Sequence, residues 1–89
     1  MLKPTIHTNG TSAKQLIARY KKAFHSLSAA IAALRECTPN GRDYYPQSAH
    51  AINDACAEHL NRVVALENVQ NELMDIMLSI RKQTKGDAK

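Results

Sequence analysis

Apolar side chains recur every three or four residues along two long segments of the chain. In the first segment the positions with this spacing are Ala13, Leu16, Tyr20, Ala23, Leu27, Ala30, Leu34 and Cys37. Such spacing places side chains on one face of an α-helix. Ser12 followed by Gln15 resembles a capping box, which would start the helix. Thr38-Pro39 would end it, because the residue before a proline avoids the helical conformation. We therefore predict a helix over residues 12–37.

The second segment repeats the same spacing over a longer stretch. Its apolar positions are Ile52, Cys56, Val63, Leu66, Leu73, Met77 and Ile80. Two polar residues, His59 and Gln70, occupy positions in this row and interrupt it. Ser48 has the side chain of an N-cap. We predict a loop over 38–48, a second helix over 49–84 and a frayed polar tail over 85–89.

The short connection makes the two helices antiparallel neighbours, so the expected architecture is an all-α two-helix hairpin in one domain, residues 1–89. With the turn centred near Arg42, Phe24 would lie opposite Leu60, and Ala13 opposite Asn71. The predicted helices are about 37 Å and about 54 Å long at the usual rise per residue. The C-terminal part of the second helix would then extend past the start of the first.

That C-terminal part is rich in large apolar side chains, each of which costs roughly 1.5–3 kcal/mol to leave in water. The candidate self-association residues are Leu73, Met74, Ile76, Met77 and Ile80. Residues 1–11 could fold over some of them, but offer only Leu2, Pro4 and Ile6. We therefore expect a homodimer, in which two hairpins form a four-helix bundle.

The chain has a formal net charge of +4, and its basic residues gather near the two ends. The candidate anion-binding residues are Lys14, Arg19, Lys21, Lys22, Arg81 and Lys82. The interpretation we favour is charge compensation between a basic first helix and an acidic second helix. Nucleic-acid binding through phosphate contacts is the alternative. The sequence lacks a zinc-finger ligand set, helix-turn-helix spacing and an aromatic platform for bases, which disfavours this alternative.

No residue pattern indicates catalysis: the sequence contains no nucleophile triad, phosphate-binding loop or paired carboxylate signature. His50, Asp54 and Glu58 share one helix face, and Cys56 lies three residues from His59. Neither set supplies four convergent metal ligands. We expect a protein that is not an enzyme and that holds no cofactor and no metal. His59 is expected to be a hydrogen-bonded residue of an interface.

The first residues lack the apolar core of a signal peptide. The longest uninterrupted apolar run, residues 29–34, is too short to cross a membrane. The expected location is the cytoplasm, with no membrane partner.

The loop holds the most distinctive residues of the chain. Asn40-Gly41 predicts a tight turn with positive φ. Arg42, Tyr44 and Tyr45 are candidate partner-contact residues, because Arg and Tyr are favoured interface anchors. The interpretation we favour for the loop is structural: the tyrosines close the end of the bundle, and Arg42 can pair with Asp43. Partner contact is the alternative, with Arg42 as the residue most expected to make it.

A resemblance follows from this loop. The run Pro39-Asn40-Gly41-Arg42-Asp43-Tyr44-Tyr45-Pro46-Gln47, followed by Glu58-His59, Arg62, Leu66 and Val69, resembles small uncharacterised helical proteins encoded in phage and prophage genomes. The likeness covers the loop and the second helix. It implies an accessory protein in a bacterial host cell that binds and modulates a host or phage protein, and it implies no catalytic residue. Non-enzymatic protein–protein interaction is therefore the expected function, and a small basic nucleic-acid-binding protein is the alternative.

Overall fold

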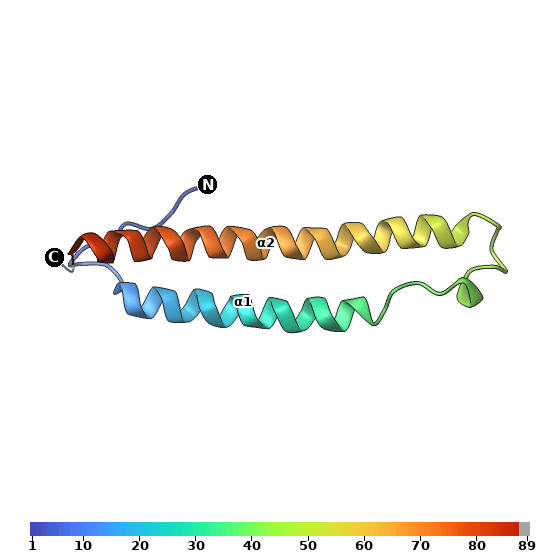
Figure 1. Ribbon diagram of the computed structural model, residues 1–89, viewed down its shortest axis with the longest axis horizontal. Coiled ribbons are helices and arrows are strands. Elements are labelled where there is room, and N and C mark those ends of the chain that lie inside the picture. Colours follow the sequence, from blue (N-terminus) through green and yellow to red (C-terminus); the bar gives the residue numbers. More distant parts are fainter. Residues whose placement is uncertain (88–89) are drawn as a thin grey trace.

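Two long antiparallel helices lie side by side in the computed structural model, which describes residues 1–87 and the side chains of residues 1–84 (Figure 1). Helix α1 spans Ala13–Arg35 and helix α2 spans Ala51–Asp87. The connection between them contains a short 3-10 helix, η1, over Gly41–Asp43. The described residues form no strand, which confirms the prediction of an all-α hairpin. The predicted frayed tail overlaps the end of α2, and its last two positions, 88–89, lie outside the described residues.

Local hydrogen bonds explain where α1 begins and ends. The Ser12 side chain accepts a hydrogen bond from the Gln15 backbone N–H at 3.2 Å, which caps a free helical donor. At the other end, the Glu36 and Cys37 N–H groups bond to Ala33 and Leu34 carbonyls, three residues back. This tighter turn ends the helix at Arg35, before the extended backbone that Pro39 requires.

The loop turns without a left-handed residue. Asn40 precedes η1 and its side chain accepts a hydrogen bond from the Arg42 N–H at 3.0 Å. The positive φ expected at Gly41 is wrong, because no residue in the described part of the chain has one. An Asx-capped 3-10 turn replaces the predicted tight turn.

The helices pair in a register different from the predicted one. Phe24 lies against Met74 and Met77, not opposite Leu60. The reason is the connection, residues 36–50, which continues past the end of α1 before the chain turns back (Figure 1). Extended chain advances about 3.3 Å per residue and helix about 1.5 Å. A few loop residues therefore pair with the first turns of α2, and α1 is left opposite the C-terminal part of α2.

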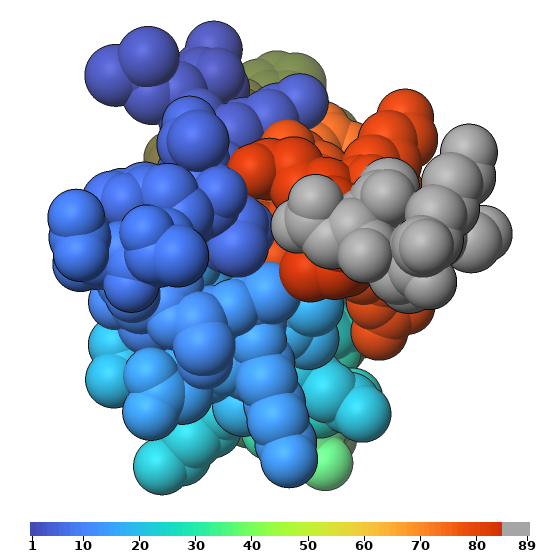
Figure 2. Space-filling view, turned by 90° about the vertical axis from the view of Figure 1, so that its left-hand side faces the viewer, coloured from blue at the N-terminus to red at the C-terminus, as the bar shows by residue number. Residues whose placement is uncertain are grey.

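The N-terminal segment, residues 1–11, folds back along α2. The side-chain amide of Gln83 fixes it: its Oε1 accepts from the Ile6 N–H at 2.8 Å, and its Nε2 donates to the Pro4 carbonyl at 2.9 Å. Pro4 and Ile6 are half-buried as a result. Figure 2 looks onto the end of the rod and shows this segment, in dark blue, beside the C-terminal part of α2 in orange.

The observed register and the docked N-terminal segment bury most of the self-association residues predicted from the sequence. Ile76, Met77 and Ile80 are buried within a single chain, and Leu73 is half-buried. Only Met74, at 40% exposure, retains a large exposed surface. The premise that this stretch extends past α1 is therefore wrong, because both α1 and the N-terminal segment reach it. The remaining buried apolar side chains of the described core are Ile31 and Val63.

Candidate interaction surfaces

One flank of α2 exposes large apolar side chains along most of its length. Leu60, Val64, Met74 and Leu78 are 60%, 42%, 40% and 47% exposed. Glu67 and Asn71 fill the two positions between them. We call these six residues the α2 stripe. Their spacing of four, three, four, three and four residues keeps them on one face of the helix.

The sequence does not predict this stripe: of its members only Met74 was a candidate self-association residue, because the register was predicted wrongly. The signal was present, since Leu60, Met74 and Leu78 keep the heptad spacing. Without the register, however, nothing decided which apolar face of α2 meets α1.

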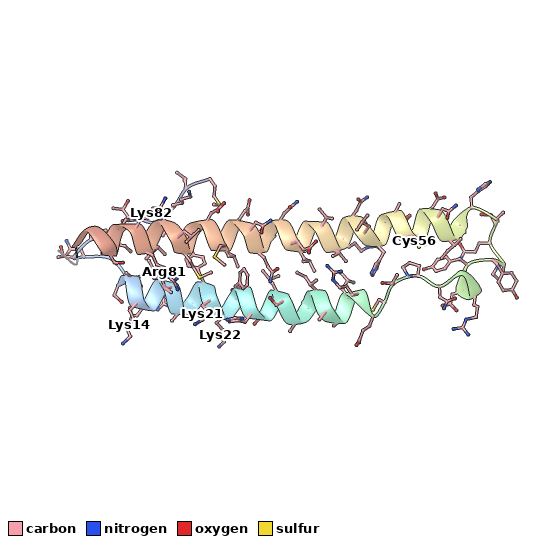
Figure 3. All side chains as sticks on the ribbon, viewed as in Figure 1. Lys14, Lys21, Lys22, Cys56, Arg81 and Lys82 are labelled. Carbon is pink, nitrogen blue, oxygen red and sulfur yellow. The ribbon has the colours of Figure 1, made fainter. Side chains whose placement is uncertain are left out.

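A pocket of 190 Å³ opens beside the stripe, between the helices. Its apolar wall consists of Phe24, Met74, Met77 and Leu78, and basic side chains surround the wall. Lys21 on α1 and Arg81 on α2 stand at this rim (Figure 3). The pocket can therefore receive an apolar side chain next to an acidic group.

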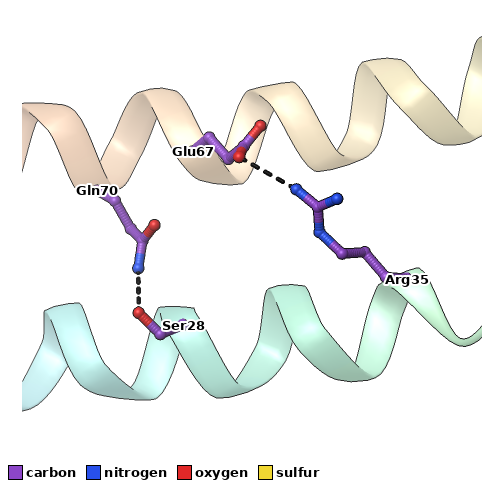
Figure 4. Close-up of polar contacts among 4 residues, drawn as sticks. All are labelled: Ser28, Arg35, Glu67 and Gln70. Carbon is purple, nitrogen blue, oxygen red and sulfur yellow. Dashed lines mark hydrogen bonds and ion pairs between the residues drawn. The ribbon is translucent and has the colours of Figure 1, made fainter.

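Polar contacts cross from α1 to α2 in the middle of the rod. Gln70 Nε2 donates to Ser28 Oγ at 2.7 Å and to the Phe24 carbonyl at 3.0 Å. Arg35 and Glu67 form an ion pair with an N···O distance of 3.3 Å (Figure 4). Both Arg35 and Glu67 are substantially exposed, so the Gln70 contacts contribute more to the register than this ion pair does.

His59 is buried and has a partner within its own chain. Its Nε2 lies 3.4 Å from Thr38 Oγ1. The Thr38 hydroxyl donates its single hydrogen to the Arg35 carbonyl. The Thr38 oxygen can therefore only accept a hydrogen bond from His59, which requires an imidazole tautomer with its hydrogen on Nε2. The hydrogen bond expected for His59 connects α2 to the chain just after α1.

The loop separates its two tyrosines. Tyr44 is half-buried and lines a 570 Å³ depression, together with Pro39 and the first turns of α2. Tyr45 is 76% exposed. Arg42 is also exposed, and its Nε donates to Asn40 Oδ1 at 3.4 Å. The predicted Arg42–Asp43 pair is not among the ion pairs formed by residues 1–84. Arg42 and Tyr45 thus form the free tip of the hairpin.

Basic side chains gather at the opposite end, where residues 1–24 lie beside residues 73–84. This end, the basic end, contains seven Lys and Arg and one acid, Asp75. The rest of the rod, residues 25–72, contains three Arg and six acids. Lys14, Lys21, Lys22, Arg81 and Lys82 are distributed around both helices of the basic end (Figure 3). Within residues 1–84, compensation between the helices is limited to the Arg35–Glu67 pair, and the charges are segregated along the rod.

His50, in the turn just before α2, and Asp54 and Glu58, on α2, are all exposed. Within the described part of the chain, no three His, Cys, Asp or Glu side chains converge on a point where a metal ion could bind. No helix found there combines the length and the hydropathy of a membrane span.

No known protein family, no curated protein and no solved structure matches this chain. The surfaces of the chain itself therefore carry the function proposed below.

Proposed function

We propose that the chain is a non-enzymatic interaction protein, in which two hairpins assemble into a dimeric four-helix bundle that binds a further protein. The α2 stripe carries this proposal. Four large apolar side chains stay 40–60% exposed along one helix flank. Large apolar side chains grouped on one helix face are typical of interaction sites, because monomers rarely leave such groups in water.

The shape of the chain supports self-association. Its accessible surface is 6766 Å², whereas a globular monomer of this mass exposes about 5,200 Å². Its radius of gyration is 19.3 Å, and a compact domain of this length has about 12 Å. The excess of about 1,500 Å² is surface that a single hairpin leaves in water and an assembly can cover.

The tip of the hairpin is the proposed contact for the further protein. Arg42 and Tyr45 project from it, next to the more buried Tyr44. Arg and Tyr supply large contact areas at a small cost in side-chain entropy. The phage or prophage setting and the cytoplasmic location stay predictions, and they would make this partner a host or phage protein.

A pair of matched valine variants tests the self-association. Val64 and Val69 are 42% and 41% exposed, but lie 140° apart around α2 at 100° per residue. Val64→Asp places a charge in the stripe and is expected to convert the dimer to a monomer in sedimentation equilibrium at micromolar concentration. Val69→Asp is the control and should remain dimeric. Wild-type protein that sediments as a 9.9 kDa monomer would remove the proposal.

A nucleic-acid-binding protein is the second candidate, favoured by the basic end. Phosphate binding needs clustered Lys and Arg, and the release of counterions provides the affinity. The same cluster is also suited to an acidic protein surface, which is why this candidate ranks second.

A further inference from the structure

We propose that a second copy of the chain docks on the α2 stripe in antiparallel orientation, with the two-fold axis passing at the level of residue 69. The inference rests on the proposed self-association and specifies its geometry. The spacings between successive stripe residues are four, three, four, three and four, so they are the same from either end of the stripe. In an antiparallel pair, Leu60 therefore meets Leu78 of the second copy, and Val64 meets Met74 of the second copy.

A two-fold interface requires this kind of self-complementarity, because each contact must occur twice. Residue 69 is also the midpoint of α2, Ala51–Asp87, so the two helices overlap along their whole length. Small β-branched Val64 opposite long, flexible Met74 gives a filled layer, as does Leu60 opposite Leu78. The four exposed apolar side chains of the stripe are thus all covered.

The charge distribution selects the antiparallel orientation. The basic end has seven basic side chains and one acid, whereas residues 25–72 have twice as many acids as basic side chains. A parallel pair would place the two basic ends together. An antiparallel pair places each basic end beside the acidic part of the other copy, including Asp54 and Glu58. Opposite charges across the interface fix its orientation.

The centre of the stripe provides a polar contact that fixes the register. Glu67 is held by Arg35 at 3.3 Å, and Asn71 lies one turn further along the same face. In the antiparallel pair the amide of Asn71 meets the Glu67 carboxylate of the second copy, once on each side of the axis. A polar pair within an apolar seam specifies register, because sliding by a heptad would leave it without a partner.

The available area is sufficient. A standard interface buries about 800 Å² on each partner. The chain exposes about 1,500 Å² more than a globular monomer of its mass, and the stripe extends over 19 residues of α2. Gln83 holds the N-terminal segment on the neighbouring flank of α2, and Lys3 of this segment reaches the edge of the stripe at Leu78.

Cysteine crosslinking of the full chain tests the orientation. Both native cysteines are free and exposed, so they are first replaced, as Cys37→Ser and Cys56→Ser. Leu60→Cys and Leu78→Cys are then made separately in this background, and their helicity is compared by circular dichroism. Each protein is treated with a short bismaleimide alone, and again after the two are mixed and allowed to exchange subunits. Val69→Cys, off the stripe, measures crosslinking by random collision.

We expect covalent dimer only in the mixture, up to about half of the chains, which is the statistical share of mixed dimers. Each protein alone should stay at the level of Val69→Cys, because its two cysteines would lie about 27 Å apart along the helix. Strong crosslinking of each protein alone would overturn the antiparallel geometry. It would leave self-association intact.

Two further outcomes are distinguishable. A dimer in sedimentation that crosslinks at none of these positions would show that the interface is not the α2 stripe. A monomer in sedimentation would remove both this inference and the proposed assembly.

Discussion

Single polar side chains decide how this hairpin closes. Gln70, Gln83 and His59 each make hydrogen bonds that connect segments far apart in the sequence. In the sequence, His59 and Gln70 look like interruptions of an apolar row. In the structure they have partners that only one pairing of the helices provides. A buried or half-buried polar group costs free energy unless it finds such a partner, so these residues disfavour the other pairings.

Gln70→Ala tests this role. The change removes the donor to Ser28 Oγ and to the Phe24 carbonyl, and should lower the free energy of unfolding by about 1–2 kcal/mol. Asn68→Ala, an exposed position on the same helix, is the control and should change it by less than about 0.5 kcal/mol. Urea titration followed by circular dichroism measures both. Equal effects would mean that Gln70 does not hold the register.

The adjacent tyrosines of the loop make a second comparison. Tyr44→Ala removes a half-buried ring from the depression at the end of the hairpin, and should destabilise the fold by about 1–2 kcal/mol. Tyr45→Ala removes an exposed ring, and Arg42→Ala removes an exposed hydrogen bond, so both should melt close to wild type. Thermal unfolding distinguishes them. A Tyr45→Ala variant that loses as much stability as Tyr44→Ala would make the tip a structural element only.

At the scale of elements, the sequence predicts both helices and the cap at Ser12, because spacing and capping are local properties. It does not predict how the helices pair. A heptad pattern repeats after seven residues, so sliding one helix by whole heptads leaves it unchanged. The predicted register placed Cys56 opposite Ser28, and the structure places Gln70 there, two heptads further along.

The choice among candidate interaction residues depended on that register. Met74 is exposed, but Ile76, Met77 and Ile80 are covered within the chain. The cover comes from α1, in its shifted register, and from the N-terminal segment, whose few apolar residues gave only a weak signal. Its docking depends on a side-chain amide that bonds to backbone groups on both sides, and such pairing leaves no periodic trace in the sequence.

Gln83→Ala is expected to release that segment. Loss of its two hydrogen bonds should lower the free energy of unfolding by about 1–2 kcal/mol. It should also expose Ile76 and Ile80, so that the folded protein binds the dye ANS more strongly. Gln15→Ala, an exposed glutamine side chain on α1, is the control. Unchanged dye binding in Gln83→Ala would show that the segment stays docked without the amide.

At the scale of the whole molecule, the rod is electrically polar. In an antiparallel dimer the acidic part of one copy lies beside the basic end of the other, which reduces the local positive potential. Attraction between surface charges is screened by salt. The two candidate functions therefore use the same lysines differently. In the dimer the lysines face carboxylates of the second copy, and in a nucleic-acid complex they face phosphates.

Binding to duplex DNA separates the two. We expect no complex tighter than about 1 µM at physiological salt, by fluorescence anisotropy. Lys21→Glu with Lys22→Glu should bind no differently from Arg42→Glu with Arg62→Glu, which makes the same change in net charge outside the basic end. A nanomolar complex that only the lysine variant weakens would favour the nucleic-acid function.

The docking of the N-terminal segment has a consequence for the order of folding. The hydrogen bonds of Gln83 join it to Ile6 and Pro4, which lie 77 and 79 positions away in the sequence. Closing so long a loop is entropically costly until the two helices have already brought the chain ends together. The segment therefore docks last and leaves first. Protection of the Ile6 amide from deuterium exchange, gained during refolding, would mark molecules in which every earlier step has succeeded, so one backbone proton reports the completeness of the fold.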